Sequence, residues 1–339
     1  MAPSLTEFRA EYLELMLRFL WRQWSAVGVA GHAETGDRWA IDPEALLAFT
    51  CTIGRYDPRL FDEVLDWLVT NERFISVQRL KTVVHREGFR GGGVLTAVAG
   101  VMGKRGIGTK WRRLASGGRE EPEDRFLFRR ADNAVLPLVG EPDPVFKSYG
   151  WLRNPLDLRG LSSEFPPYAK NCLWLRLRAL FGVSARCEIA LLLLVSGRAG
   201  ASDIARQTFY FHRTIQDAVG EMSRSGLVTS RRQGRERLYA LSAPEKWESL
   251  LELDQGALNW VCWPPLLSAL EAIWLCIQPD AFAKLPPLLQ MSELRKLMRE
   301  GVSAKLGRSG LTASLPDAER LAGMAYLDEL LVAIRNLLG

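Results

Sequence analysis

Histidine is scarce in this chain of 339 residues, and its cysteines are not paired by spacing. It contains three histidines and five cysteines, which lie far apart in the sequence. No Cys-x-x-Cys pair and no Cys/His cluster has the spacing of a zinc site, so we expect no bound metal and no cofactor. The cysteines stand among apolar residues, which favours buried, reduced thiols.

Motifs of common catalytic centres are also missing. The sequence has no Gly-x-Ser-x-Gly, no His-Glu-x-x-His and no closely spaced carboxylate pair in a suitable context. Asp57, Asp62 and Glu63 are better explained as a helix cap and first-turn charges. We therefore predict that the protein is not an enzyme; an enzyme such as a nucleotidyltransferase is a weak third alternative.

No apolar run has the character of a membrane-spanning helix. The longest, at about 257–278, contains two prolines and Glu271, and its apolar residues recur at helical spacing. A charge at mid-bilayer costs about 2.5–3.5 kcal/mol on insertion scales, and the periodicity indicates a one-sided helix. The first twenty residues contain three glutamates and lack the charge pattern of a secretory signal. We expect a cytoplasmic protein without membrane contact.

A Gly-rich, basic segment at 91–113 is the one place to test for a phosphate-binding loop. A Walker A loop ends in Gly-Lys followed by Ser or Thr, but Gly103-Lys104 is followed by Arg105. The motif therefore fails. Contact with a phosphate backbone is more plausible, with a solvated basic loop as the alternative. The residues that would make these secondary phosphate contacts are Lys104, Arg105, Lys110, Arg112 and Arg113.

The length predicts more than one domain. We expect an N-terminal helical domain at 1–113, an irregular Pro/Gly-rich connector at 114–170, a third domain at 171–245 and a C-terminal helical domain at 246–339. Helices capped by Asp42, Asp57 and Ser76 fit either a second helix-turn-helix-like unit or a plain helical bundle. The long apolar seam of the last helix, at 317–338, would suit a dimer interface, and packing within one chain explains it about as well.

The stretch from Ala185 to Ser242 has the most specific pattern. It predicts an apolar helix, a short helix, a tight turn and a longer amphipathic helix at about 212–225. Gly226 is expected to end that helix. Two short apolar strands, at 227–230 and 237–241, then flank a cationic tip at 231–235. From 198 to 237 the sequence has eight arginines against four acidic residues.

This order resembles the winged helix-turn-helix domain of bacterial transcription regulators, in the broad group that includes the ArsR and MarR types. The resemblance covers about 175–245 and rests on SDIARQT, RTIQDAVGEMSRSGLV and SRRQGRERLYAL. Phe209 and Phe211 stand where the family usually has a Gly in the turn and a Ser or Thr cap. The implied fold class is mainly α with small β-hairpins, with a winged domain flanked by helical domains.

The resemblance implies that the helix at 212–225 enters the major groove of double-stranded DNA. There Arg213 could donate two hydrogen bonds to guanine and Gln216 to adenine. The other residues expected at the DNA are His212, Arg206, Thr208, Arg231, Arg232, Arg235 and Arg237, which would contact phosphate or, from the hairpin, the minor groove.

We therefore predict a sequence-specific transcriptional regulator that binds a short inverted repeat as a homodimer. Regulators with large extra domains often sense a ligand, so an unidentified protein or small-molecule effector is expected. The alternative is a non-enzymatic protein-interaction module, antitoxin-like or an adaptor, that contacts its partner through Phe209, Tyr210 and Phe211.

Overall fold

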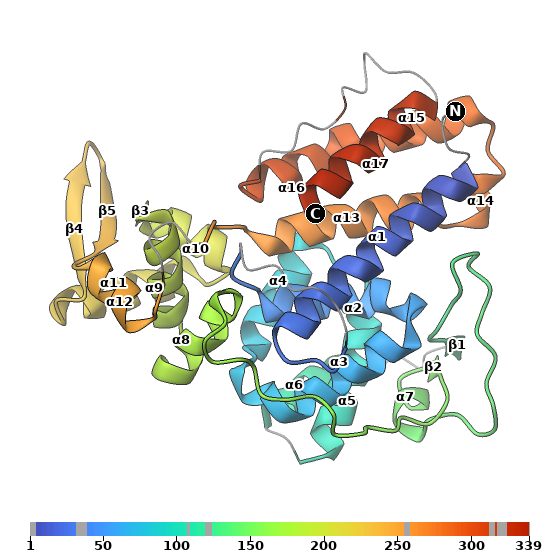
Figure 1. Cartoon of the computed structure of the whole chain (residues 1–339), viewed down its shortest axis with the longest axis horizontal. Helices are drawn as coiled ribbons and strands as arrows, with labels where there is room; N and C mark the ends of the chain where they lie inside the picture. The colour runs from blue at the N-terminus through green and yellow to red at the C-terminus, as the bar shows by residue number, and fades with distance from the viewer. Residues whose placement is uncertain are drawn as a thin grey trace.

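The computed structural model describes residues 5–31, 39–106, 109–118, 124–253, 258–311, 316 and 324–338. The chain is mainly helical with small sheets, and Figure 1 shows the arrangement. Within these ranges, no helix combines the length and the hydropathy that crossing a membrane requires. The predicted final helix begins at Met324 in the described part, and positions 317–323 lie outside it.

The elements before the small sheet are α1 (Leu5–Ala26), α2 (Pro43–Ile53), η1 (Gly54–Tyr56), α3 (Pro58–Asn71), η2 (Glu72–Phe74), α4 (Val77–Glu87), α5 (Gly92–Lys104), α6 (Thr109–Ala115), η3 (Ser116–Gly118), β1 (Arg125–Phe126), α7 (Pro144–Lys147), β2 (Trp151–Leu152), η4 (Lys170–Cys172), α8 (Leu173–Phe181) and α9 (Ala185–Ser196). They are followed by β3 (Arg198–Gly200), α10 (Ala201–Thr208), α11 (His212–Arg224), β4 (Val228–Gln233), β5 (Glu236–Leu241), α12 (Pro244–Leu250), α13 (Trp263–Ile277), α14 (Asp280–Ala283), α15 (Pro287–Leu297), η5 (Met298–Val302), α16 (Ser303–Arg308) and α17 (Met324–Leu338).

Three helices of the N-terminal half begin at the predicted caps. The Asp42 carboxylate accepts hydrogen bonds from the amides of Glu44 and Ala45 at the start of α2. Asp57 caps α3 and Ser76 caps α4 in the same manner. Each cap satisfies amides that would otherwise have no partner in the first helical turn, and these three predictions are confirmed.

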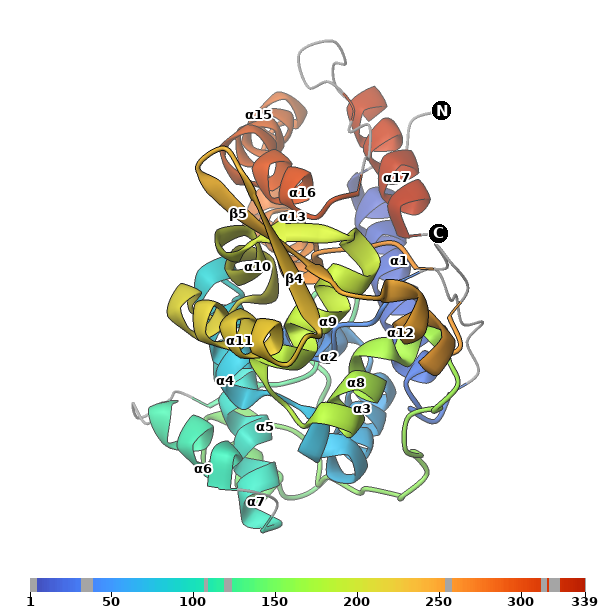
Figure 2. The same cartoon turned by 90° about the vertical axis from the view of Figure 1, so that its left-hand side faces the viewer.

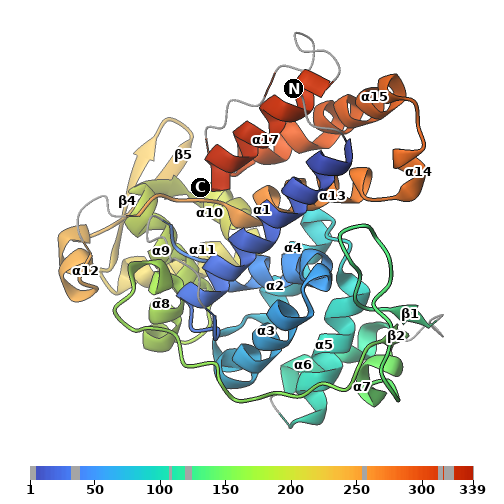
Figure 3. The ribbon, with the colours of Figure 1, turned by 45° about the vertical axis from the view of Figure 1, so that its right-hand side comes forward.

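The N-terminal and C-terminal helices share one hydrophobic core, which we call the helical body (residues 5–172 and 261–338). Helix α13 packs on α2, and α17 lies beside α1 (Figures 1 and 3). The Tyr12 ring of α1 stacks on Trp274 of α13, with centroids 6.4 Å apart, and its hydroxyl donates to the Leu270 carbonyl. A separate domain was expected at 246–339, but α13 and α17 pack on α2 and α1, so within the described residues these helices share a core with the N-terminal helices.

A second core lies in what we call the small unit (residues 173–251), which extends to one side of the helical body in Figure 1. Helices α9, α10 and α11 pack around Ile189, Ile204, Ile215 and Val219. Strands β3, β5 and β4 form an antiparallel sheet in that order, in which β5 is the central strand. The short strand β3, which was not predicted, closes this sheet against the start of α10.

Five charged side chains buried together join the small unit to the helical body. Arg178 of α8 contacts Glu44 of α2 at 2.6 Å and Glu188 of α9 at 2.7 Å. Arg79 of α4 contacts Asp42 at 2.6 Å and Glu44 at 2.7 Å. All five side chains are shielded from solvent. We call this set the buried charge cluster.

The buried charge cluster contains three carboxylates and two guanidinium groups, so its acids outnumber its bases. Burial opposes the ionisation of Glu44, but Arg178 and Arg79 outweigh it and hold the Glu44 pKa below its usual value. For Glu188, burial dominates and the pKa is raised despite Arg178. One Glu188 oxygen also has no hydrogen-bond partner among the described residues. Of the two glutamates, Glu188 therefore accepts a proton more readily.

Helix α4 faces the small unit through Arg79. Arg79, on the face considered for DNA contact, is buried and donates from Nε to the Thr208 carbonyl at 2.9 Å. Its guanidinium also lies over the Trp174 ring, 4.6 Å from the centroid. Arg79 is therefore not available to DNA, while Gln78 of the same face is exposed, and the two interpretations of residues 42–87 both stay predictions.

We predict that Arg178→Met lowers the free energy of unfolding by about 3–5 kcal/mol, because it leaves Glu44 and Glu188 buried with one cation fewer. The matched variant Glu188→Gln removes the surplus carboxylate and is expected to be at least as stable as the wild type. Urea unfolding at pH 7 measures both. Equal destabilisation by the two variants would contradict this account of the cluster.

Glu271 of α13, the acidic residue within the most apolar stretch of the sequence, is also buried. It accepts hydrogen bonds from the Thr52 hydroxyl and, at 3.1 Å, from the Arg90 amide. Burial raises its pKa from 4.5 to about 7. The folded state therefore holds this proton at pH values where the unfolded chain releases it.

Because the folded state keeps this proton while the unfolded chain loses it, the free energy of unfolding falls as the pH rises from about 4.5 to 7. Glu271 accounts for about 3 kcal/mol of this decrease. We predict that Glu271→Gln removes that loss, so the variant gains stability relative to the wild type on going from pH 5 to pH 8. Urea unfolding of both proteins across this range tests it. A stability difference that stays constant with pH would refute the assignment.

Candidate nucleic-acid interface

Helix α11 presents a polar face to solvent, as its periodicity predicts. Ile215, Val219 and Met222 lie inward in the small unit, and the opposite face is open. The Arg213 side chain is 82% exposed and its Nε lies 3.1 Å from the Asp217 carboxylate. Such an exposed pair contributes little to stability, so Arg213 can exchange this partner for another acceptor at small cost.

The remaining predicted residues of this face are also accessible. His212 begins α11 and its Nε2 lies 3.4 Å from the Ser202 hydroxyl. Gln216 lies one turn further along the exposed face. The face therefore presents an imidazole, a guanidinium and an amide, which are side chains able to hydrogen-bond phosphates or base edges.

The hairpin of β4 and β5 extends the exposed cationic surface beyond α11 (Figure 2). Its turn is tighter than predicted, because β4 continues to Gln233, and Gly234 adopts a positive φ of 61°. Arg231 and Arg232 therefore lie in β4, Arg237 lies in β5, and Arg235 lies in the turn. In the part of the chain that the structure describes, none of these four arginines has an acidic partner.

Two of these arginines lie directly opposite each other. Arg232 of β4 and Arg237 of β5 are cross-strand partners in the ladder. Like charges in this position are destabilising. Arg232 Nε donates to the Gly234 carbonyl, and in the described part of the chain neither side chain has an acidic partner. An anion bound between the strands would relieve this repulsion.

Two residues expected at the phosphates are placed differently by the structure. Arg206 is exposed but pairs with Asp203 at 2.6 Å. Thr208 is fully buried, and its hydroxyl donates to the Ile204 carbonyl at 2.7 Å. The expected phosphate contact of Thr208 is therefore wrong, since its side chain closes the last turn of α10 while its carbonyl binds Arg79.

The second basic segment is only partly free for an external contact. Lys104, Arg105, Arg112 and Arg113 are exposed at the end of α5 and on α6. Lys110 instead donates to the carbonyls of Glu72 and Ile75 and pairs with the Glu72 carboxylate at 2.9 Å. The prediction for Lys110 is corrected accordingly, because the ammonium group ties α6 to the segment before α4.

The aromatic turn between α10 and α11 is used mainly inside the protein. Phe209 has a positive φ of 64°, and its buried ring belongs to the core of the helical body. Tyr210 is half-buried, and burial raises its pKa to about 12. Only Phe211 is largely open, at 61% exposure. The three aromatic residues thus do not form one continuous docking surface for a partner protein.

Arg86 of α4 was not among the predicted site residues, but in the structure it lies beside the first turn of α11. This α4 residue is exposed, and its guanidinium lies 5.8 Å from the Phe211 ring centroid. The only signal in the sequence was the excess of basic residues from Arg86 to Arg113. The contact between α4 and the turn could not be derived from that excess.

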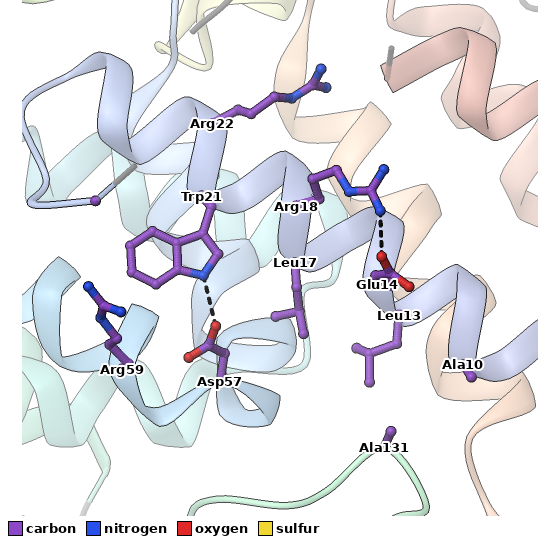
Figure 4. A pocket seen from close by; sticks show the side chains of 11 residues that line it. Ala10, Leu13, Glu14, Leu17, Arg18, Trp21, Arg22, Asp57, Arg59 and Ala131 are labelled. Atoms are coloured by element: carbon purple, nitrogen blue, oxygen red, sulfur yellow. Dashed lines mark hydrogen bonds and ion pairs between the residues drawn. The ribbon is translucent and has the colours of Figure 1, made fainter. Parts of the chain in front are cut away.

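A groove of about 920 Å³ lies between α1 and α3 (Figure 4). The Trp21 indole donates to Asp57 at 2.8 Å, and Arg18 pairs with Glu14. Arg59 lies over the Trp21 ring, 5.7 Å from its centroid. These interactions already engage Glu14 and Asp57, and neither histidine nor cysteine is among the described residues that line the groove.

A neighbouring acidic group also has internal partners. Asp62 pairs with Arg153, Glu63 with Arg159, and Asp66 accepts from two loop amides. Across the described ranges, no group of three or more His, Cys, Asp or Glu side chains is arranged to hold a metal ion. The five cysteines are free thiols, and four of them are buried.

Comparison with known proteins gave no relative: no protein-family model, no curated protein and no solved structure matches this chain.

We predict that Phe209→Ala lowers the free energy of unfolding by about 3–5 kcal/mol, because it empties a filled position in the helical body. Phe211→Ala, two residues away and exposed, is expected to change it by less than about 0.5 kcal/mol. Thermal and urea unfolding compare the two variants. Similar effects at both positions would show that the turn is not anchored as described.

Proposed function

We propose that this chain is a DNA-binding transcriptional regulator and that residues 185–241 form a winged helix-turn-helix unit. The observation that supports this best is the order α9, β3, α10, α11, β4, β5 with the sheet order β3-β5-β4. In this unit α11 and the β4–β5 hairpin lie on the same side of the molecule (Figure 2), and the polar residues of α11 and the arginines of the hairpin are exposed. A nucleic acid is the polyanion that such a surface suits.

In the proposed complex, α11 lies in the major groove and the β4–β5 hairpin follows a neighbouring backbone. Arg213 exchanges Asp217 for guanine acceptors, and Gln216 reaches adenine. Arg231, Arg232 and Arg235 contact phosphates, which position the helix without reading the sequence.

Gly220 supports a close approach of DNA to α11. A Cβ atom at this position would meet nothing within 4 Å, so internal packing does not require glycine here. Glycine in a helix interior costs about 1 kcal/mol relative to alanine. A duplex lying against the helix at this point would account for the missing side chain.

The wider proposal includes a homodimer on an inverted repeat, a cytoplasmic location and an effector that is still to be identified. A C2 dimer presents two α11 helices to two half-sites. The protein-interaction module is less well supported, because Phe209 and Tyr210 of its expected surface pack within the chain.

A mobility-shift titration tests the proposal, with DNA from upstream of the protein's own gene and an unrelated duplex of equal length. If four or more phosphates are contacted, affinity falls by roughly a hundredfold or more between 50 and 200 mM salt. We predict that Arg231→Ala/Arg232→Ala weakens binding to both duplexes and lowers the slope of log affinity against log salt by about 1.8.

The charge-matched control is Arg18→Ala/Arg59→Ala on the α1–α3 side of the helical body. It is expected to bind like the wild type, because its net charge changes equally while the interface is untouched. Absence of binding at 50 mM salt, or equal loss in both double variants, would count against DNA binding by this surface.

A further inference from the structure

Helix α4 of the helical body runs along the turn that precedes α11. Near its start, Arg79 donates to the Thr208 carbonyl, and its guanidinium lies 5.9 Å from the Phe209 ring centroid. Near its end, Arg86 lies against Phe211, the N-cap residue of α11. The two contacts together place the exposed end of α4 beside the first turn of α11.

The Arg86 guanidinium is held in place while remaining open to solvent. Its centre is 5.8 Å from the centroid of Phe211, within the range of a cation–π interaction. Within the described ranges Arg86 has no acidic partner. A cation placed in this way keeps its charge available and has fewer side-chain conformations to lose when it binds an anion.

The acid that follows Arg86 in the sequence does not neutralise this surface. Glu87 is buried on the other side of α4, where Arg308 binds it through two hydrogen bonds of 2.9 and 2.7 Å. Lys81, His85 and Arg90 line a hollow of about 370 Å³ next to the same helix end. The exposed end of α4 is therefore cationic.

We propose that Arg86 binds a phosphate of the same duplex that α11 reads, so that the helical body supplies part of the DNA interface. The inference rests on the proposed function. In helix-turn-helix proteins the N-terminal residues of the reading helix contact base edges, and Arg86 lies beside that end of α11. Phe211 keeps the guanidinium at the border of the groove, where the backbone passes.

The test uses the full-length chain on the two duplexes already described. Arg86→Ala is expected to weaken binding about fivefold at 0.15 M salt, to a similar extent on both duplexes, and to lower the salt slope by about 0.9. Arg86→Lys is expected to keep most of the slope, since it keeps the charge. Phe211→Ala should weaken binding less than Arg86→Ala.

Arg59→Ala is the matched control, because Arg59 is also an exposed arginine stacked on an aromatic ring. It should leave affinity and slope unchanged. If Arg86→Ala behaves like this control while Arg231→Ala/Arg232→Ala weakens binding, the inference fails and the proposed function stands. If none of these variants changes binding, the proposed function itself fails. Weaker binding with an unaltered slope would also overturn the phosphate contact.

Discussion

The buried charge cluster is the constraint on which the arrangement of the chain depends. Two arginines and three carboxylates from α2, α4, α8 and α9 meet where water is excluded. Removing such charges from water costs several kcal/mol for each ion, and only close partners offset this cost. Because Arg178 of α8 binds Glu44 of α2 and Arg79 of α4 donates to the Thr208 carbonyl, separating the small unit from the helical body would break both contacts and leave Glu44 with one arginine fewer. The two cores are therefore coupled.

This coupling decides what the α10–α11 turn can do. Arg79 occupies the Thr208 carbonyl, and Phe209 inserts its ring into the core of the helical body. The turn between α10 and α11 is thus packed against α4. The helical body therefore determines which residues lie beside the first turn of α11.

Local features were predictable from the sequence because each depends on a few neighbouring residues. Asp42, Asp57 and Ser76 bind amides two or three positions away, and the caps follow from that chemistry. Arg213, Arg231 and Arg232 of the proposed interface were predicted to be exposed cations on an amphipathic helix and a hairpin, and the structure places them on α11 and β4. These predictions required no knowledge of distant contacts.

Several of the incorrect predictions concern contacts with segments that are remote in the chain. Thr208 binds within its helix while its carbonyl meets Arg79, 129 positions earlier. Lys110 reaches Glu72, and α17 finds its cover on α1. A polar side chain or an apolar seam looks the same in the sequence whether it faces solvent or a distant segment, so only the fold separates these outcomes.

The turn and the hairpin each contain one locally unfavourable feature: the positive φ of Phe209 and the opposed pair of Arg232 and Arg237. A left-handed conformation at Phe209 costs about 1–2 kcal/mol, and burial of its ring, at about 1.5–3 kcal/mol, offsets that cost. It needs no ligand as an explanation. The opposed arginines Arg232 and Arg237 have no such compensation among the described residues, because both are exposed and neither meets an acid. An unfavourable arrangement that nothing inside the protein offsets is expected at a binding site. An external anion bound at the β4–β5 hairpin would account for the opposed arginines, which no contact within the described residues explains.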